Sequence, residues 1–314
     1  MGFLFRSYQL HIYGDVSAHP GVFNKIRFIH SVDLLVTPND VIWEQISFPY
    51  AARQARLIHG AGGRIPLATR IPRVLTLFDV NVGPLMAAPV KKAPAVFTLS
   101  QTLSDRLIQG GLKKERVVTL PLAPTVAMPN PPIYPKEPYL LMVLDHRDAA
   151  PLSHGLAVIK ELKNAEIALK VIVRDAKTQH WVERLALRQG LLPPKVEAVV
   201  PERPATVDVL FQQASAVLVL APGLRAVMTA LNAWAAGTPL VAVSTLELTD
   251  LESAALVTRE RDLATALAAV DTVLTEAARG QDIVGRGQER VRDLHWKAAA
   301  EITREAYLKV LEPR

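Results

Sequence analysis

The 314-residue sequence predicts an α/β protein of two domains, each built on a parallel sheet. Short apolar runs typical of strands alternate with longer stretches of helical character along most of the chain, which is the pattern of parallel strands covered by helices. The alternation is interrupted at residues 121–138, which hold seven prolines in 18 residues. Because proline disfavours both helices and sheet hydrogen bonds, this segment is expected to link the two domains.

The first half of the chain contains two helical patterns, at 43–56 and 101–111. Ser100 can cap the second helix with its hydroxyl, and Gly110-Gly111 is expected to end it. Strands are expected at 8–14, 32–37, 55–60, 72–79, 93–100 and 116–122.

The second half repeats the alternation more regularly. Strands are expected at 139–145, 169–175, 196–200, 216–222 and 239–244. Helices are expected at 154–165, 177–191, 205–214, 226–237 and 261–280, with 251–258 before the last of them. Residues 287–311 predict one or two amphipathic helices, in which His295-Trp296 would be a buried aromatic anchor.

The composition narrows the function classes. Half of the residues are apolar and 21% are charged, which is typical of a folded globular protein. The absence of cysteine excludes disulfides, thiolate metal sites and a cysteine nucleophile, and it fits a reducing compartment. The net charge of +6 favours acidic partners, but the densest basic clusters, at 91–94 and 112–116, are short and lack interleaved aromatics, so nucleic-acid binding is not expected.

The targeting signals in the sequence are few. No run of 18 apolar residues predicts a transmembrane helix. The first residues, MGFLFRSYQLHIYGDV, lack the basic region and cleavage site of a signal peptide. We therefore expect a cytoplasmic protein, either free or peripheral to a membrane.

Five segments together resemble the retaining glycosyltransferases of family 4, which have the GT-B fold. No single segment decides the resemblance, which lies in their order and spacing. The segments are WEQISFPYAAR (43–53), PRVLTLFDV (72–80), FTLSQTLSDRLIQGGLKKERVVTLPLAP (97–124), VDVLFQQASAVLVLAPGLRAVMTALNAWAAGTPLVAV (207–243) and LHWKAAAEITREAYLKVL (294–311).

The resemblance implies a GT-B-like α/β architecture with two Rossmann-like domains, parallel sheets and a C-terminal crossover helix. Residues 1–125 would form a shortened, acceptor-side domain, followed by a proline-rich linker at 126–138. Residues 139–290 would form the donor-side domain, and the closing helix at 291–314 would return to the first domain.

The family binds a sugar nucleotide through two carboxylates on the donor-side helix and the glycines between them. Matching the family's small residue and Gly-Thr-Pro to residues 236–239 puts the ribose-binding carboxylate at Asn232 and the sugar-binding one at Leu224. The intervening glycines become Arg225 and Val227. An asparagine still hydrogen-bonds a ribose, though more weakly than a carboxylate. A leucine cannot bind a sugar hydroxyl.

The other family positions are altered as well. The histidine of the first domain is replaced by Phe78, next to Asp79, and the basic pair expected within 145–155 leaves only Arg147 and His154, neither clearly in register. A cleft lined by Phe78 and the altered donor residues would be apolar. We assign no catalytic residue. The candidate remnant positions of the donor cleft are Asn232, Arg225, Asp79 and Arg147.

Each candidate also has a structural interpretation. Asp79 at a strand end is typical of a turn or helix cap, and Arg225 of a solvated loop. Arg147 and Asp148 would form a local surface pair, and Asn232 stands in mid-helix, where asparagine is a poor helix former. The eight histidines show no metal-ligand spacing, so neither a metal nor a cofactor is expected.

Three functional hypotheses follow from these altered positions. The first is a non-catalytic glycosyltransferase homologue that acts as a structural or regulatory partner, as a homo-oligomer or with another chain, and binds a sugar nucleotide weakly at most. The alternative is an active retaining transferase with an unusual donor site and an unknown acceptor. A GT-B sugar-nucleotide epimerase is a third and weaker hypothesis, because it also needs carboxylates and histidines that the sequence does not place.

Overall fold

The computed structural model divides the chain into two compact units. Unit 1 consists of residues 1–122 and 295–314, and unit 2 of residues 123–294. The first unit therefore ends inside the proline-rich segment, and the chain returns to it after Leu294. The structure describes residues 12–14, 29–31, 45–46, 48–61, 65–67, 69–78, 90–129, 137–144, 147–245 and 251–312.

Unit 1 is organised around a four-stranded parallel sheet with the order β3-β4-β5-β6. These strands are Ile58–Ala61, Arg73–Leu77, Ala95–Thr98 and Val117–Thr119. Two further strands, β1 and β2, pair in parallel with each other at Ile12–Gly14 and Ile29–Ser31. Other elements in the described part of the unit include α3 (Phe48–Ala51), α5 (Gln101–Gln109), η3 (Lys114–Arg116) and α13 (Trp296–Leu311).

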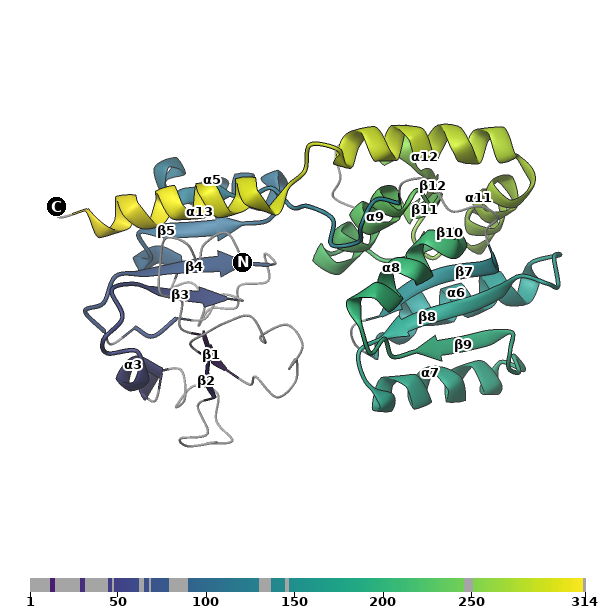
Figure 1. The fold of residues 1–314 in the computed structure, drawn as a ribbon, viewed down its shortest axis with the longest axis horizontal. Coiled ribbons are helices and arrows are strands. Elements are labelled where there is room, and N and C mark those ends of the chain that lie inside the picture. Colours follow the sequence, from purple (N-terminus) through teal and green to yellow (C-terminus); the bar gives the residue numbers. More distant parts are fainter. Residues whose placement is uncertain are drawn as a thin grey trace. The chain divides into compact units, whose positions relative to one another are not determined.

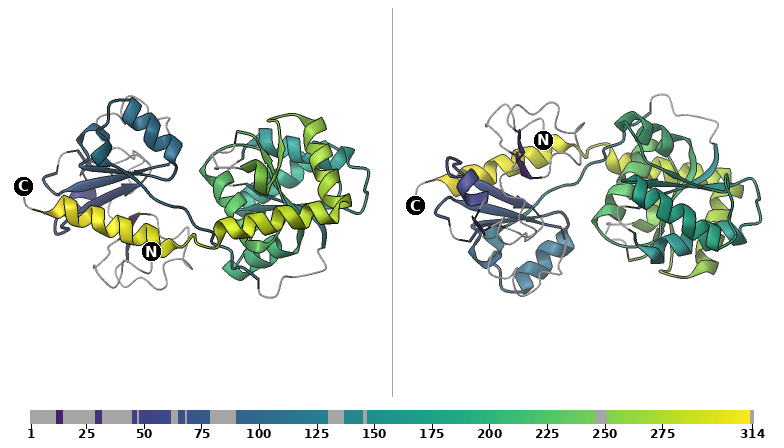
Figure 2. Two further views of the ribbon diagram at one scale, coloured as in Figure 1. Left: turned by 90° about the horizontal axis from the view of Figure 1, so that it is seen from above. Right: turned by 90° about the horizontal axis from the view of Figure 1, so that it is seen from below.

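The two faces of the four-stranded sheet are covered by different helices. Leu75 and Val96 pack with Leu103 of α5, whereas Val74 and Phe97, which point the other way, pack with Tyr307 of α13. Figures 1 and 2 show α13 lying along this second face. Alternate residues of each strand therefore serve the two faces, as strand geometry requires.

Unit 2 contains a six-stranded sheet, entirely parallel, with the order β12-β11-β10-β7-β8-β9. In chain order, β7 to β12 are Glu137–Leu144, Ala168–Val173, Val196–Val199, Ala214–Val219, Leu240–Val243 and Leu256–Thr258. The helices α6 to α12 are Ala149–Glu161, Ala176–Arg188, Pro204–Gln213, Leu224–Ala236, Leu251–Ala254, Leu263–Thr275 and Ala277–Val291.

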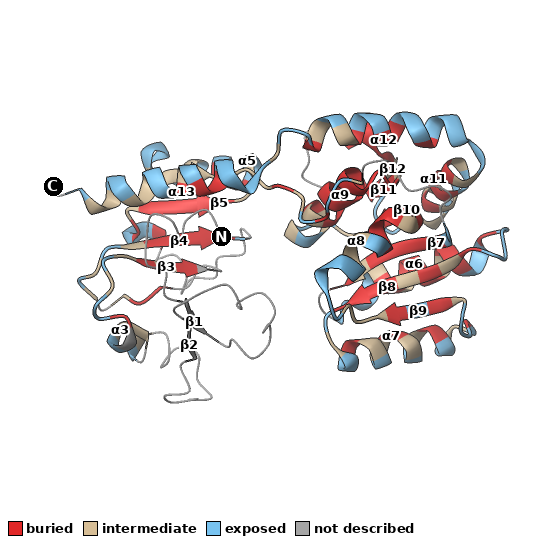
Figure 3. Ribbon diagram, viewed as in Figure 1, coloured by how far each residue is buried: buried red, intermediate tan, exposed pale blue. Residues whose placement is uncertain are grey.

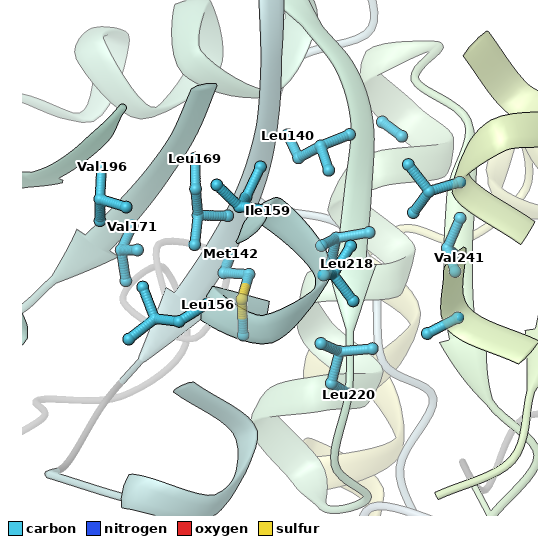
Figure 4. Packing of buried hydrophobic residues seen from close by; sticks show 14 of the residues in the cluster. Leu140, Met142, Leu156, Ile159, Leu169, Val171, Val196, Leu218, Leu220 and Val241 are labelled. Carbon is cyan, nitrogen blue, oxygen red and sulfur yellow. The ribbon is translucent and has the colours of Figure 1, made fainter. Parts of the chain in front are cut away.

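The main core of unit 2 lies between its sheet and the helices α6, α7 and α11 (Figure 4). The strands are mostly buried, while the helices expose their outer sides (Figure 3). Leu218 belongs to this core, and its neighbours Val217 and Val219 are buried on the opposite face, where α8 and α9 pack. Residues labelled in the core are Leu140, Met142, Leu156, Ile159, Leu169, Val171, Val196, Leu218, Leu220 and Val241.

The predicted α/β class with parallel sheets is confirmed. Ser100 caps α5 by accepting a hydrogen bond from the Leu103 amide at 3.1 Å, and the chain leaves that helix at Gly110, followed by Gly111 with φ of +93°. Among the described residues, no helix is long and apolar enough to cross a bilayer.

Three of the expected helices have other bounds in the structure. The helix expected at 43–56 is limited in the described residues to α3 and a short π-helical pair at 45–46. The one expected at 154–165 begins earlier, at Ala149, because Asp148 caps it. The helix expected at 261–280 is broken at Glu276 into α11 and α12. Within 251–258, a short helix precedes the strand.

Candidate functional site

The donor-side helix of the resemblance is α9, which follows β10 at the carboxyl edge of the six-stranded sheet. Gly223 precedes it with φ of +123° and has no side chain to cap the helix. The first amides of a helix have no partner within the helix, so this end attracts anions. Gly237 ends the helix in the left-handed conformation, with φ of +67°.

Asn232 lies in the middle of α9 and is buried. Its side-chain oxygen accepts hydrogen bonds from the Thr125 amide at 2.8 Å, the Thr125 hydroxyl at 3.2 Å and the Val126 amide at 3.2 Å. Thr125 and Val126 belong to the first residues of unit 2 after the chain leaves unit 1. The oxygen that the resemblance assigns to a ribose therefore holds the incoming chain to α9.

The residues at the start of α9 differ in exposure. Arg225 is exposed and Leu224 is half-buried. Val227 is only 8% exposed, because it lies one turn into the helix on the side that packs into unit 2. The expectation that Val227 faces a ligand is therefore wrong, and only the first residues of α9 are open to solvent.

Arg147 and Asp148 precede α6, and both are exposed. Asp148 caps the helix by accepting a hydrogen bond from the Ala150 amide at 3.1 Å. In unit 1, Phe78 follows β4 and is 46% exposed. Asp79 lies outside the described residues. The three hydrogen bonds of the Asn232 side-chain oxygen go to the chain itself.

His154 is a buried member of α6, which begins before the expected helix at 154–165. Neither of its ring nitrogens has a hydrogen-bond partner among the described residues. Burial lowers the pKa of His154 below 6.5, although the backbone and carboxylate of nearby Asp262 act in the opposite direction. The imidazole is therefore neutral at pH 7, and it supplies no positive charge for a diphosphate.

A second polar group, in unit 1, was not found from the sequence. His59 on β3 hydrogen-bonds through Nε2 to the Thr76 hydroxyl at 2.6 Å and through Nδ1 to the Tyr307 hydroxyl of α13. Its ring stacks on Phe97, with centroids 5.1 Å apart. Burial lowers the pKa of His59 to about 4, so the ring is neutral at pH 7.

The cluster around His59 left no signal in a single sequence, because Tyr307 is 248 residues away. Nor did the structure support the aromatic anchor expected at His295-Trp296. Trp296 is the first residue of α13 and is 36% exposed. Tyr307, three turns later, is the aromatic residue that packs on the sheet.

The described residues contain no group of three or more His, Asp or Glu side chains that could hold a metal ion.

Solved structures provide the comparison that identifies the fold. A glycosyltransferase from Rickettsia africae superposes with a TM-score of 0.73 at 11% identity, covering 99% of this chain and 92% of that one. Sucrose-phosphate synthase from Thermosynechococcus elongatus gives 0.68 at 17% identity, covering 84% and 76%. The chain has the GT-B glycosyltransferase fold.

A third GT-B structure, HepE from Anabaena in complex with UDP-glucose, gives a TM-score of 0.65 at 14% identity and covers 84% of this chain and 80% of that one. No protein-family model matches the sequence, and no curated protein matches it. At these identities the likeness establishes the GT-B fold and leaves the activity to be argued from the site.

Proposed function

We propose that this protein is a non-catalytic homologue of the family 4 retaining glycosyltransferases, with a degenerate sugar-nucleotide site, and that it serves as a structural or regulatory partner. The GT-B fold supports the relationship to glycosyltransferases. The residues of α9 support the loss of catalysis.

The single observation that carries the proposal is the engagement of Asn232. In the family, a carboxylate at this place accepts hydrogen bonds from the ribose hydroxyls. Here the side chain is a neutral amide, and its oxygen already accepts three hydrogen bonds from Thr125 and Val126. A ribose hydroxyl would have to displace backbone donors that are then left unpaired, which costs about 1–3 kcal/mol for each buried group.

The neighbouring positions lack the groups that the reaction needs. Leu224 has no polar atom in its side chain, so it cannot orient a sugar hydroxyl. His154 is neutral, so it does not supply the positive charge that would balance the charge growing on a departing diphosphate. Since removal of one preorganised donor typically costs about 3 kcal/mol of transition-state stabilisation, several such losses leave little catalysis.

One observation favours the alternative, an active retaining transferase. Arg225 is exposed at the start of α9, where Gly223 leaves the helix without a side-chain cap. A helix N-terminus beside an arginine is suited to a phosphate group. HepE was solved with UDP-glucose, so uridine diphosphate sugars are the first donors to test.

A turnover assay separates the two functions. The purified protein is incubated with uridine, guanosine and adenosine diphosphate sugars, and release of the nucleoside diphosphate is measured with and without candidate acceptors. We expect no release above the rate of a heat-denatured sample. Turnover at about 1 per second or faster, lost in Arg225→Ala, would establish the active transferase instead.

A partner function also predicts an assembly. Light scattering of the purified chain at micromolar concentration, and of the tagged chain in native extract, measures whether it is a homo-oligomer or joins another chain. The proposal expects a mass above that of the 34.3 kDa monomer in at least one of these conditions. A strict monomer in both, together with turnover, would contradict it.

A further inference from the structure

Two basic clusters that are separate in the sequence lie at the same edge of the unit 1 sheet. Lys91 and Lys92 belong to a helical turn just before β5, and Lys113 and Lys114 stand just before β6. The two strands are neighbours and parallel, with Val96 opposite Val117. All four lysines therefore belong to the amino edge of this sheet.

Arg116 fixes the two clusters against each other. Its Nε donates to the Ala93 carbonyl at 2.9 Å, and its Nη2 donates to the carbonyls of Val90 and Lys91, each at 3.0 Å. The guanidinium thus caps the end of the helical turn that carries Lys91 and Lys92. Because Lys113 and Lys114 are three and two residues from Arg116, their backbone lies within about 10 Å of it.

The lysines themselves are available for an outside partner. All four are exposed, and none of the ion pairs between described residues includes them. Glu115 is the acidic residue within the two clusters. We call Lys91, Lys92, Lys113 and Lys114 the lysine surface. It has a net positive charge, and the Arg116 hydrogen bonds hold its two backbone segments together.

We propose that the lysine surface docks unit 1 on an anionic lipid surface. Lysine heads on flexible stems suit a fluid layer of anionic headgroups, and each lysine near such a surface strengthens binding roughly fivefold. Single-stranded nucleic acid is a poorer fit, because it needs exposed aromatic rings on which bases stack. Within 90–129 the one aromatic residue is Phe97, which is fully buried.

The lysine surface lies at the edge of the unit 1 sheet opposite to the edge where ligands usually bind. In open α/β sheets, ligands bind at the carboxyl ends of the strands. The lysine surface occupies the opposite edge of the same sheet, so lipid docking there would not use the carboxyl edge of unit 1. The proposal does not depend on whether unit 2 binds a sugar nucleotide.

Vesicle co-sedimentation of the full chain tests the proposal. The probes are mixed phosphatidylglycerol–phosphatidylcholine vesicles and pure phosphatidylcholine vesicles. We expect binding to the mixed vesicles only, with release when salt rises from about 0.05 to about 0.5 M. Replacing all four lysines by alanine (K91A/K92A/K113A/K114A) should weaken the binding at least tenfold.

A matched variant controls for net charge. K160A/K163A/K177A/K309A also removes four exposed lysines, but from scattered positions, and it should lose less than threefold. Circular dichroism and thermal melting verify that both variants fold. Equal losses in the two variants, no binding of the wild-type chain to anionic vesicles, or tighter binding to a fluorescent RNA or DNA oligonucleotide than to the vesicles would each overturn the proposal.

Discussion

The chain crosses between its two units twice. After each crossing, a polar side chain forms hydrogen bonds with the segment that has just entered the unit. In unit 2, Asn232 of α9 holds the incoming residues Thr125 and Val126. In unit 1, the returning helix α13 brings Tyr307 to His59, which also bonds Thr76. Both sets of hydrogen bonds hold a segment that has just entered a unit, but the Asn232 amide and the His59 imidazole differ in chemistry.

Among the described residues, the Asn232 side chain acts only as an acceptor and does not titrate, whereas His59 is a partly buried imidazole that can take up a proton. Both polar side chains therefore stabilise the packing of the chain itself. For Asn232 this matters most, because the resemblance assigns that position to a ligand. If these hydrogen bonds stabilise the fold, substitutions at His59, Asn232 and Tyr307 should each change the stability of the protein.

The largest expected effect is a loss of stability in acid that depends on His59. Burial lowers its pKa from 6.5 to about 4, so the unfolded chain binds more protons than the folded one between these values. The stabilisation is present above pH 6.5 and falls as the pH drops toward 4, by about 3 kcal/mol in all. Urea unfolding of wild type and His59→Gln across this range measures the difference.

His154 also has a lowered pKa, but it contributes to both proteins in that comparison, so the difference between them isolates His59. The prediction requires the wild type to lose more stability than His59→Gln between pH 6.5 and pH 4. Parallel pH profiles for the two proteins would mean that the His59 imidazole titrates normally.

The next effect concerns Asn232. Asn232→Ala removes an acceptor from two backbone amides and a hydroxyl, and unpaired buried donors should lower the free energy of unfolding by about 2 kcal/mol. Asn232→Asp keeps an acceptor and should cost less than half as much. Both are measured by urea unfolding at pH 7. Equal stability of the alanine variant and wild type would show that the hydrogen bonds to Asn232 contribute nothing to the free energy of unfolding.

A smaller effect is expected at Tyr307. Tyr307→Phe keeps the ring that packs edge-on against Phe97 but removes the hydroxyl that bonds His59, at a cost of about 1 kcal/mol. Tyr50 is 71% exposed in the same unit, so Tyr50→Phe is the matched control and should change little. The melting temperature of each variant is compared with that of wild type. Equal shifts in the two variants would show that the Tyr307–His59 hydrogen bond does not stabilise the protein.

The sequence predicted the elements whose signals are local. The α5 boundaries followed from Ser100 and Gly110, because capping depends on residues a few positions apart. The break at Glu276 was not predictable, since apolar residues continue on both sides of it. There Thr272 and Thr275 bond carbonyls one turn back, which weakens regular helix, and α12 packs on α9 through Gly287 beside Trp234.

The site was harder to predict, because its decisive contacts join distant residues. Aligning short motifs located Asn232, but the hydrogen bonds from Thr125 span 107 positions and have no local signature. Val227 was expected to face a ligand because the resemblance aligns it with a glycine of the family's donor segment, yet the helix buries its side chain. The lysine surface likewise depends on the pairing of β5 with β6, which brings two clusters to one edge.

Isothermal titration calorimetry with uridine, guanosine and adenosine diphosphate sugars tests the central claim that the donor site is degenerate. A degenerate site should give no saturable heat for any donor up to about 1 mM, a concentration that covers the usual range of substrate affinity. The same result is expected for Arg225→Ala. Saturable binding in the micromolar range by the wild-type chain, abolished in Arg225→Ala, would contradict the account and show that α9 still binds a sugar nucleotide.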